Sequence, residues 1–411
     1  MRISLDIAVV GCGVGGQAAA TLLADAGHRV TLVERFAEPR PLGAGLLLQP
    51  TGLAVLARLG LDEEVLALGA RIDGLDGRTA GGRRVLDLHY RTLHPRAFGL
   101  GIHRGALFEL LYGRLKRSAA SLVTSTEIVS IEQDGARAYL SDTTGTAHGP
   151  FDVVIVADGA HSALRERLMP EARALLYPWG CVWATVTDDS ADFDGMLRQR
   201  FRGTAVMMGL LPVGRLPDDA PGTRRVTLFW SLPIVGGTVH PPADIAAWKA
   251  EATALWPEAR ALVERIDGVA AFTSASYRHV ALSGWSDGPV VFMGDAAHGT
   301  SPQLGQGANL VLLDAHALVR SLAGEDRVGD ALRLFEQRRV PSTRFYRHAS
   351  HLLTPFFQSN LRSLGWLRDA FMGPSCHLPV MSRMMASTLA GTRRGWLGST
   401  SLDVEGRYPL D

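Results

Sequence analysis

The chain is poor in cysteine and lysine, and it has no long apolar run. Its three cysteines, Cys12, Cys181 and Cys376, are too far apart for a metal motif and form no even set for disulfides. This pattern fits a reduced, cytoplasmic compartment. No apolar run reaches the roughly 18 residues that span a bilayer, so stable membrane insertion is not expected. Lys116 and Lys249 are the only lysines, which restricts any mechanism that requires one.

Charge and composition are those of an ordinary globular protein. The 411 residues carry a formal net charge of +1, which gives no broad field for nucleic acid or for an anionic membrane. A hydrophobic fraction of 46% and a charged fraction of 20% are typical of a soluble protein. Because an apolar strand pattern begins within the first residues, no signal peptide is expected. Its length predicts two or three lobes.

A glycine-rich turn near the start predicts a dinucleotide-binding unit. Gly11, Gly13 and Gly16 follow a strand-like run at 5–10 and open a helical pattern. The spacing allows a tight turn, close approach of the backbone to a pyrophosphate, and packing of the helix on the strand. A second strand at 29–33 ends on Glu34, whose carboxylate is placed to accept hydrogen bonds from ribose hydroxyls.

A second glycine loop lies near residue 300. The apolar run 290–293 predicts a buried strand, and it is followed by Asp295 and then by Gly305 and Gly307. A helical pattern continues from there to Leu322. The carboxylate of Asp295 is suited to sugar or ribityl hydroxyls, and free N–H groups at the helix start are suited to an anion.

Two further features lie between these loops. The strand-like run 152–156 ends in Asp158-Gly159, ahead of a helix that carries Arg165. Arg104 opens another predicted helix, which extends to about Ser118, and it is an anion or hydroxyl contact. His298 lies in the loop near residue 300 and is a candidate general base, although a structural hydrogen-bonding role is the more common one for such a histidine.

The pattern along the chain predicts an α/β fold with a Rossmann-like nucleotide domain, an inserted antiparallel sheet and C-terminal helices. A hairpin is expected at 73–97, a β-meander at 127–150, and antiparallel strands followed by a helical stretch, 245–266, within 179–270. A long helix from 328 to 348 is expected to be interrupted at Pro341. We assign 1–72, 98–178 and 271–350 to the nucleotide domain, 73–97 and 179–270 to the sheet domain, and 351–411 to a helical tail.

Taken together and in this order, the motifs resemble those of the single-component FAD-dependent aromatic hydroxylases over roughly residues 5–350. The resemblance implies that FAD is the cofactor. It places Glu34 on the adenosine ribose, Asp295 on the ribityl chain, and the helix start near Gly305 against the pyrimidine edge of the flavin. The full set of cofactor-binding residues that it implies is Gly11, Gly13, Gly16, Glu34, Arg35, Arg104, Asp158, Asp295, Gly305, Gly307, Ala308 and Asn309.

The implied reaction follows from the cofactor. NADH or NADPH binds transiently and reduces the flavin, dioxygen forms a flavin hydroperoxide, and one oxygen passes to an electron-rich small molecule. His298 and Pro302 are candidates for a catalytic role, while the flavin itself performs the chemistry. The apolar lining predicts a bulky, hydrophobic aromatic or polyketide-like substrate, which is hydroxylated or epoxidised. The pocket candidates are Leu46, Met207, Met208, Trp230 and Pro302.

Other functions remain open at this level. Flavin-dependent halogenases share the motifs, but they need a lysine beside the substrate and a Trp-x-Trp-x-Ile-Pro segment, and 179–183 does not match it. An FAD-dependent reductase or oxidase of the same fold, without oxygen insertion, is the nearest alternative. An NAD-dependent dehydrogenase would leave Asp158 and Asp295 unexplained, and a non-catalytic flavin-binding protein stays open. A monomer or homodimer is expected, with no metal.

Overall fold

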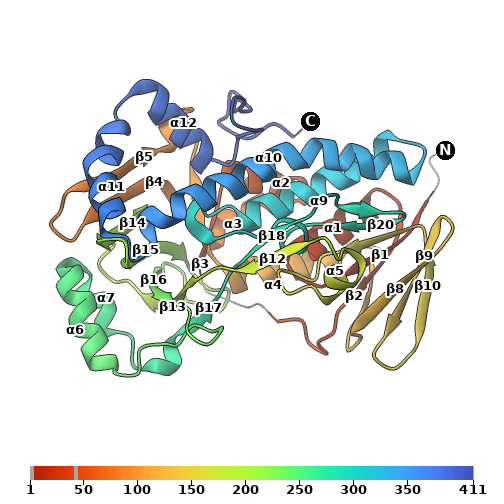
Figure 1. Cartoon of the computed structure of the whole chain (residues 1–411), viewed down its shortest axis with the longest axis horizontal. Coiled ribbons are helices and arrows are strands. Elements are labelled where there is room, and N and C mark those ends of the chain that lie inside the picture. Colours follow the sequence, from red (N-terminus) through yellow and green to blue (C-terminus); the bar gives the residue numbers. More distant parts are fainter. Residues whose placement is uncertain (1–3, 41–44, 411) are drawn as a thin grey trace.

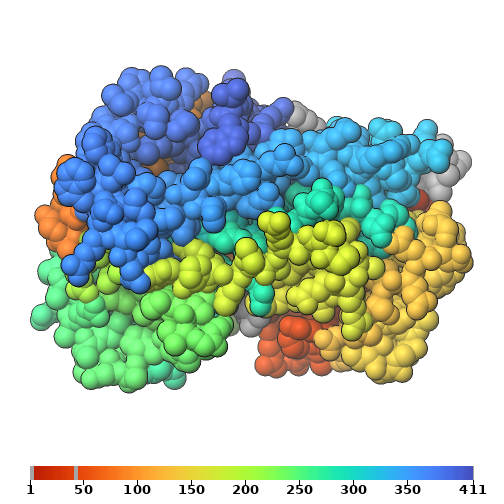
Figure 2. All heavy atoms as spheres, in the orientation of Figure 1, coloured from red at the N-terminus to blue at the C-terminus, as the bar shows by residue number. Residues whose placement is uncertain are grey.

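The computed structural model describes residues 4–40 and 45–410. The outer ends of the predicted ranges, at 1–3 and 411, therefore lie outside the described residues. One half of the molecule contains a parallel sheet and a small meander, and the other half contains a large, mainly antiparallel sheet (Figure 1). The long helix α10 runs along both halves, and the C-terminal helices form one outer corner (Figures 1 and 2). The predicted α/β fold class is confirmed.

The parallel sheet has six strands in the order β19-β20-β11-β1-β2-β7. All neighbours are parallel except β19, which pairs antiparallel with β20. The central strands are apolar on both faces because helices cover both faces, as is usual for parallel sheets. The strand bounds are β1 Asp6–Val10, β2 Arg29–Val33, β7 Ser121–Val123, β11 Val153–Val156, β19 Ser286–Asp287 and β20 Val290–Phe292.

Three helices belong to the layers around this sheet. Helix α1 (Val14–Asp25) connects β1 to β2, and α4 (Arg104–Lys116) precedes β7. Helix α9 (Gly307–Gly324) packs against α1 so closely that a Cβ at Gly15 would overlap the side chain of Val311. Because α1 and α9 each begin next to one of the two glycine loops, this packing fixes the distance between those loops.

The large sheet has the order β17-β13-β16-β15-β14-β4-β6-β3, and β5 pairs with β4. Residues alternate between its two faces. One face is covered by α6 (Ile245–Leu255) and α7 (Arg260–Glu264), with Trp248 and Trp256 in the core between them. The strand bounds are β3 Gly45–Leu48, β4 Ala70–Thr79, β5 Arg84–His89, β6 Gly99–His103, β13 Trp179–Thr187, β14 Gly195–Arg202, β15 Val206–Gly214, β16 Arg225–Pro233 and β17 Thr273–Ala275.

The predicted hairpin at 73–97 and the meander at 127–150 are confirmed as β4–β5 and β8–β9–β10. Because β3 and β6 hydrogen-bond into the large sheet, that sheet crosses the predicted domain boundaries at 72 and 98, and the division into domains stays a prediction. The meander strands are β8 Ile128–Asp134, β9 Arg137–Asp142 and β10 Ala147–Phe151, and a further pair is β12 Arg173–Leu176 with β18 Arg278–Ala281.

Two helix predictions need correction. The stretch 245–266 is broken at Trp256-Pro257, because proline there starts a new turn. Helix α10 (Val328–Phe357) continues through Pro341 and beyond the predicted end, since its buried side keeps the helix packed. The remaining helices are α2 Pro50–Arg58, α3 Asp62–Leu68, α5 Ala163–Leu168, α8 Asp295–His298, α11 Arg362–Ser375 and α12 Pro379–Leu389.

Candidate functional site: a dinucleotide cradle beside a curved sheet

The sequence motifs meet at one edge of the parallel sheet. Strands β1, β11 and β20 are neighbours, with Val10 beside Val156 and Val156 beside Phe292. Each motif follows the carboxyl end of one of these strands, and such edges are where ligands bind in open α/β sheets. Gly11 has a φ of +104°, and a Cβ there would lie 2.8 Å from the carbonyl oxygen of Ala157. The first and second loops are therefore in direct contact.

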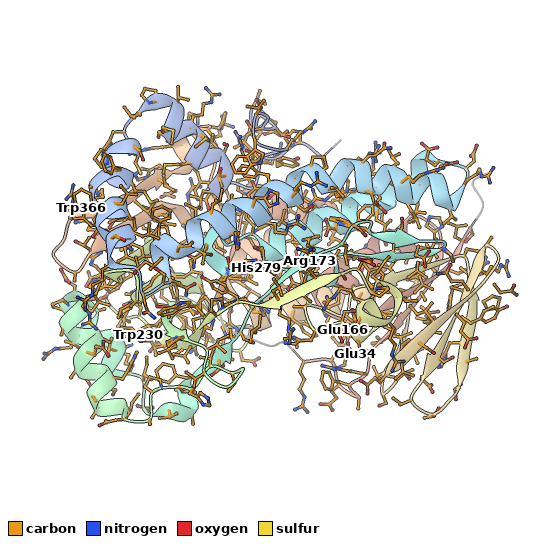
Figure 3. The ribbon with its side chains drawn as sticks, viewed as in Figure 1. Glu34, Glu166, Arg173, Trp230, His279 and Trp366 are labelled. Carbon is orange, nitrogen blue, oxygen red and sulfur yellow. The ribbon has the colours of Figure 1, made fainter. Side chains whose placement is uncertain are left out.

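Glu34 holds the shape of the first turn. Its carboxylate accepts hydrogen bonds from the backbone N–H groups of Cys12 (2.8 Å) and Phe36 (3.1 Å). Figure 3 places Glu34 in the half of the molecule with the parallel sheet. A Cβ at Gly16 would overlap the carbonyl oxygen of Gly11, so α1 can leave the turn only from a glycine.

The second loop contains an unusual carboxylate. Burial raises the pKa of Asp158 to about 6, against the lowering effects of Ser162 and of the arginines nearby. Its Oδ1 atom is buried without a hydrogen-bond partner. A buried acceptor of this kind usually has a partner, so this oxygen is suited to accept a hydrogen bond from a bound ligand or water.

Arg165 joins the second loop to the third. Its side chain is fully buried and donates to the carbonyl oxygens of Ala160 (2.9 Å) and Ala296 (3.1 Å). Ser162 caps α5 by accepting from the N–H of Arg165 at 3.0 Å. The loops that follow β11 and β20 are thus held together by one guanidinium, and the sequence motif alone did not indicate this role.

The helix start after the third loop offers backbone donors. The N–H groups of Gly307, Ala308 and Asn309 come before the first residue of α9 that finds an intrahelical acceptor, Leu310 bonding to Gln306. Asp295 begins α8 with its side chain exposed. This arrangement combines a carboxylate for hydroxyl groups with a positive helix end.

The side chain of Asn309 is already in use. Its Oδ1 accepts from the N–H of Gln49 (2.8 Å), and its Nδ2 donates to the carbonyl oxygens of Leu47 (3.0 Å) and Gly305 (3.2 Å). Asn309 therefore fastens β3 and the start of α2 to the helix start. Any contact of this residue with a cofactor would come from its backbone N–H.

His298 is not placed for catalysis, which corrects the candidate role from the sequence. It is 4% exposed, and its Nε2 lies 2.5 Å from Oδ2 of Asp314. Asp314 also accepts from Arg339 (2.7 Å) and from the N–H of Gly294 (3.0 Å). The ring stacks on Trp285 with centroids 5.0 Å apart. His298 therefore supports the third loop from behind.

Burial disfavours the ionised form of Asp314, but the charges and hydrogen bonds of His298 and Arg339 outweigh burial. Together they hold the pKa of Asp314 at about 2. The backbone of Gly294 is consequently anchored to a permanent, fully buried negative charge.

Two exposed arginines lie at the loops without counter-charges. In the described ranges, neither Arg35 nor Arg104 forms an ion pair, although the Arg35 guanidinium lies over the ring of Phe36 at 4.6 Å. Arg104 is the first residue of α4, and His103 caps that helix by accepting from the N–H of Gly105 at 3.1 Å. Both arginines are available to an anion.

The five pocket candidates do not lie together. Met208 and Trp230 are 0% and 3% exposed in the core under α6 and α7, and Trp230 packs edge-on against Trp248. They are therefore core residues on the far face of the sheet, which corrects their assignment. Figure 3 shows Trp230 in the lobe of the large sheet, well away from Glu34.

The other three candidates differ in position. Met207 points to the opposite face from Met208, against Phe229 and Phe357. Leu46 is half-buried in β3, and Pro302 opens the short 3₁₀ turn Pro302–Leu304 just before Gly305. Leu46 and Pro302 therefore flank the helix start, whereas Met207 lies on the face of the large sheet that Gly45 and Leu47 approach.

The structure shows hydrogen-bonded polar side chains that the sequence analysis did not identify. The amide oxygen of Gln358 accepts from Tyr177 (3.1 Å) and from Gln303 (2.5 Å), and the hydroxyl of Tyr277 lies 3.2 Å from the thiol of Cys181. These residues come from distant segments that only the folded chain brings together, so no linear motif could have identified them.

The residues present fit an extended dinucleotide such as FAD. The backbone is bare where such a cofactor would lie, since a Cβ at Gly13, Gly159, Gly305 or Gly307 would meet no atom within 4 Å. The orphaned oxygen of Asp158, the unpaired arginines and the free helix-start N–H groups supply polar partners for hydroxyls and a pyrophosphate. The arrangement defines a flavin-dependent enzyme of the dinucleotide-binding class.

Comparison with known proteins agrees with this geometry. Residues 4–341 match the family described as FAD binding domain. The 3-amino-4-hydroxybenzoate 2-monooxygenase of Streptomyces cremeus is 32% identical over 426 residues, covering 96% of this chain and 94% of the relative. A probable 2-heptyl-3-hydroxy-4(1H)-quinolone synthase of Rhodococcus erythropolis is 26% identical, covering 95% and 97%. The chain belongs to the FAD binding domain family and is an FAD-dependent monooxygenase.

Solved structures share the fold. Klebsiella pneumoniae HpxO, solved with FAD and uric acid, superposes with a TM-score of 0.77 at 20% identity, covering 96% of this chain and 98% of that one. The tetrameric form of 2-methyl-3-hydroxypyridine-5-carboxylic acid oxygenase gives a TM-score of 0.75 at 22% identity, covering 93% and 96%. The shared fold agrees with the family match and with the S. cremeus relative, which confirm the resemblance to the FAD-dependent aromatic hydroxylases.

Proposed function

We propose that the enzyme hydroxylates or epoxidises a bulky, uncharged and largely hydrophobic aromatic or polyketide-like molecule. The chemistry of one face of the large sheet carries this proposal. This is the face opposite to the one covered by α6 and α7, and it carries Thr227 of β16. It is directed toward β3, because a Cβ at Gly45 would lie 2.7 Å from the hydroxyl of Thr227. Asn309 ties the same strand to the start of α9. A substrate between sheet and flavin would therefore lie against this face.

The face offers apolar surface and neutral hydrogen-bonding groups. It carries Trp183 and Phe229, whose ring centroids are 5.3 Å apart, and the hydroxyls of Thr185 and Thr227, which lie 2.8 Å apart. Among the residues that β13, β15 and β16 place here, all of which the structure describes, Arg225 alone is charged.

Arg225 is already neutralised. Its guanidinium makes two bonds of 2.6 Å to the carboxylate of Asp219, and these bonds hold the pKa of Asp219 at about 2. A substrate carboxylate would have to displace that carboxylate to gain a cation. The S. cremeus relative's name specifies a benzoate and the R. erythropolis relative's name a heptyl quinolone. The neutral face of this chain favours the second kind of substrate.

The residues of the cradle would hold FAD, and each has a definite task. Glu34 and Asp295 would accept from ribose and ribityl hydroxyls. Arg35 and Arg104 would lie near the adenosine and pyrophosphate–ribityl portions. The first-turn N–H groups of α9 would stabilise negative charge on the reduced ring. Bound FAD, once reduced by NADH or NADPH, supplies the activation of dioxygen, while the packed sheet excludes water from the reacting centre.

The experiment compares two probes on the FAD-loaded enzyme. NADH and NADPH oxidation is measured with a 2-alkyl-4-quinolone and with 3-amino-4-hydroxybenzoate, and products formed under heavy-isotope dioxygen are analysed by mass spectrometry. We expect the uncharged probe to accelerate oxidation and to gain one labelled oxygen. Acceleration by the benzoate alone would refute the substrate class. Oxidation without labelled product would favour the FAD-dependent reductase or oxidase instead.

The proposal also covers the cellular compartment and the oligomeric state. We take the enzyme to act in the cytoplasm as a monomer or homodimer. In the part of the chain that the structure describes, no helix is long and apolar enough to cross a membrane. Light scattering of the purified, FAD-loaded chain would decide between the two oligomeric states.

A further inference from the structure

The net charge of +1 conceals a strong asymmetry along the chain. Residues 337–402 contain nine arginines and a single acidic residue, Asp369, which gives this segment a net charge of +8 and leaves −7 for the rest. The segment comprises most of α10 and all of α11 and α12. Arg339 is buried against Asp314, and Arg368 is paired with Asp369, so the surface charge of the segment comes from its other arginines. Positive surface charge of this kind favours an anionic partner.

The same corner carries the main cluster of exposed apolar side chains among the described residues. Trp366, Phe371 and Val380 are 70%, 61% and 81% exposed. In Figure 3, Trp366 projects away from the fold at the outer edge of α11, and Figure 2 shows α11 and α12 at the surface. The C-terminal apolar patch, as we call it, consists of Leu361, Trp366, Leu367, Phe371, Leu378, Val380 and Met384.

The outward orientation of this patch is built into the packing of α11. A Cβ at Gly373 would overlap the carbonyl oxygen of Arg84, so the inner side of α11 lies directly on β5. Arg368 is 1% exposed, donates to the carbonyl oxygen of Phe356 at 2.9 Å, and lies over the ring of Phe201 at 4.7 Å. These contacts fix the rotation of the helix. Leu367 and Phe371, four residues apart in α11, then share the outer stripe of that helix.

Two arginines flank the patch, and within the described residues neither has an ion-pair partner. Arg362 lies one helical turn before Trp366, and Arg383 lies three residues after Val380. Both are exposed, and neither forms an ion pair with any residue in the ranges 4–40 and 45–410. Exposed tryptophan and phenylalanine with arginines nearby are the composition of helices that lie in a membrane interface.

We infer that the C-terminal apolar patch, flanked by Arg362 and Arg383, docks the enzyme on the surface of an anionic phospholipid membrane. The aromatic and aliphatic side chains would enter the boundary between headgroups and acyl chains, and the arginines would meet lipid phosphates. A second copy of the chain fits less well. A symmetric dimer through this patch would bring two strongly positive segments together without a counter-charge.

The test uses full-length, FAD-loaded enzyme and sedimentation with sucrose-loaded vesicles. One vesicle is phosphatidylcholine alone, and in the other a third of the lipid is phosphatidylglycerol. One variant combines Trp366→Ser with Phe371→Ser, and another combines Arg362→Glu with Arg383→Glu. The matched controls are Val235→Ser, an exposed apolar residue in the turn after β16, and Arg260→Glu on α7. Circular dichroism and bound flavin confirm folding of every variant.

The wild type and both controls should bind the anionic vesicles at least tenfold more strongly than neutral ones, with binding weakened by salt. Each double variant should lose at least tenfold in binding while retaining FAD. Equal binding of wild type and variants would overturn the inference. So would an enzyme that ignores vesicles of both compositions, or one that dimerises in solution through Trp366 and dissociates in the serine variant. None of these readouts depends on turnover, so they test the inference separately from the proposed reaction.

Discussion

Replacing Asp314 by asparagine would remove the negative charge that supports the third loop from behind. The carboxylate is fully buried and serves three donors: the ring of His298, the guanidinium of Arg339, and the N–H of Gly294. Asparagine has nearly the same size, but it offers one acceptor oxygen and no charge. Arg339, only 6% exposed, would then be a buried cation without a counter-charge.

The magnitude follows from that unpaired cation. Breaking one partner of a buried ion pair costs about 3–5 kcal/mol, because the remaining charge has lost its compensation for desolvation. The control is Asp330→Asn, since Asp330 forms a surface ion pair with Arg333. Loss of an exposed pair should change stability by less than about 1 kcal/mol. Both variants remove one acid, so their difference isolates burial.

The assay is urea unfolding of the FAD-free protein at pH 7, together with FAD titration by fluorescence quenching. We expect Asp314→Asn to lower the unfolding free energy by about 3 kcal/mol. FAD affinity should fall about tenfold, a loss of about 1.4 kcal/mol, because the anchored Gly294 directly precedes Asp295. The control should change neither quantity measurably.

The dependence on pH gives a second check of the same carboxylate. The pKa of Asp314 is about 2 in the folded protein, below its usual value of 3.8. Its contribution to stability is therefore complete above pH 4 and is lost as the pH falls toward 2. The gap between wild type and Asp314→Asn should narrow over that window. A gap below about 1 kcal/mol at pH 7, or one that does not narrow in acid, would refute the reasoning.

Three further predictions concern the cradle and the sheet. Asn309→Ala should weaken FAD binding by about tenfold in a fluorescence titration, because β3 loses its tie to the helix start, and unchanged affinity would contradict that role. Burial raises the folded pKa of Asp158 to about 6, so the FAD-free protein should lose ~1–2 kcal/mol as the pH rises from 4 to 7, and Asp158→Asn should abolish this slope in urea titrations. Trp230→Leu should lower stability by about 2–3 kcal/mol and leave the KM for the uncharged probe unchanged, whereas Trp183→Ala should raise that KM several-fold with a smaller loss of stability. The reverse pattern would show that the faces are misassigned.

The meeting of the motifs could be predicted from the sequence because it rests on local rules. Gly11, Asp158 and Asp295 each follow a short apolar run, and the carboxyl ends of neighbouring parallel strands share one edge. The side-chain roles could not be predicted in the same way. Two partners of Asn309, Leu47 and Gln49, lie about 260 residues away, and neither segment contains a pattern that predicts the contact.

The substrate face was beyond sequence reasoning for a geometric reason. Met207 and Met208 are adjacent in a strand, so they must point to opposite faces, and the choice between faces depends on what covers each one. Trp230 lies opposite Val182, whereas Trp183 lies opposite Phe229. This register decides which tryptophan reaches the core under α6 and which faces β3. The sequence alone does not show which of the two tryptophans faces the core and which faces β3.

The polar groups of the site fall into two sets: one holds the protein backbone in place, and the other is free to bind a ligand. The side chains of Glu34 and Asn309 hydrogen-bond to backbone groups and hold them in place. His298 bonds to the carboxylate of Asp314, which in turn holds the backbone N–H of Gly294. Within the described part of the chain, the groups of the site without a protein partner include the Oδ1 of Asp158, the guanidinium of Arg104, and backbone N–H groups at the start of α9. A ligand must satisfy such groups. The glycine backbone between these groups leaves an extended space for that ligand. Because the first set of side chains fixes the loops, the binding site is preformed before the ligand binds.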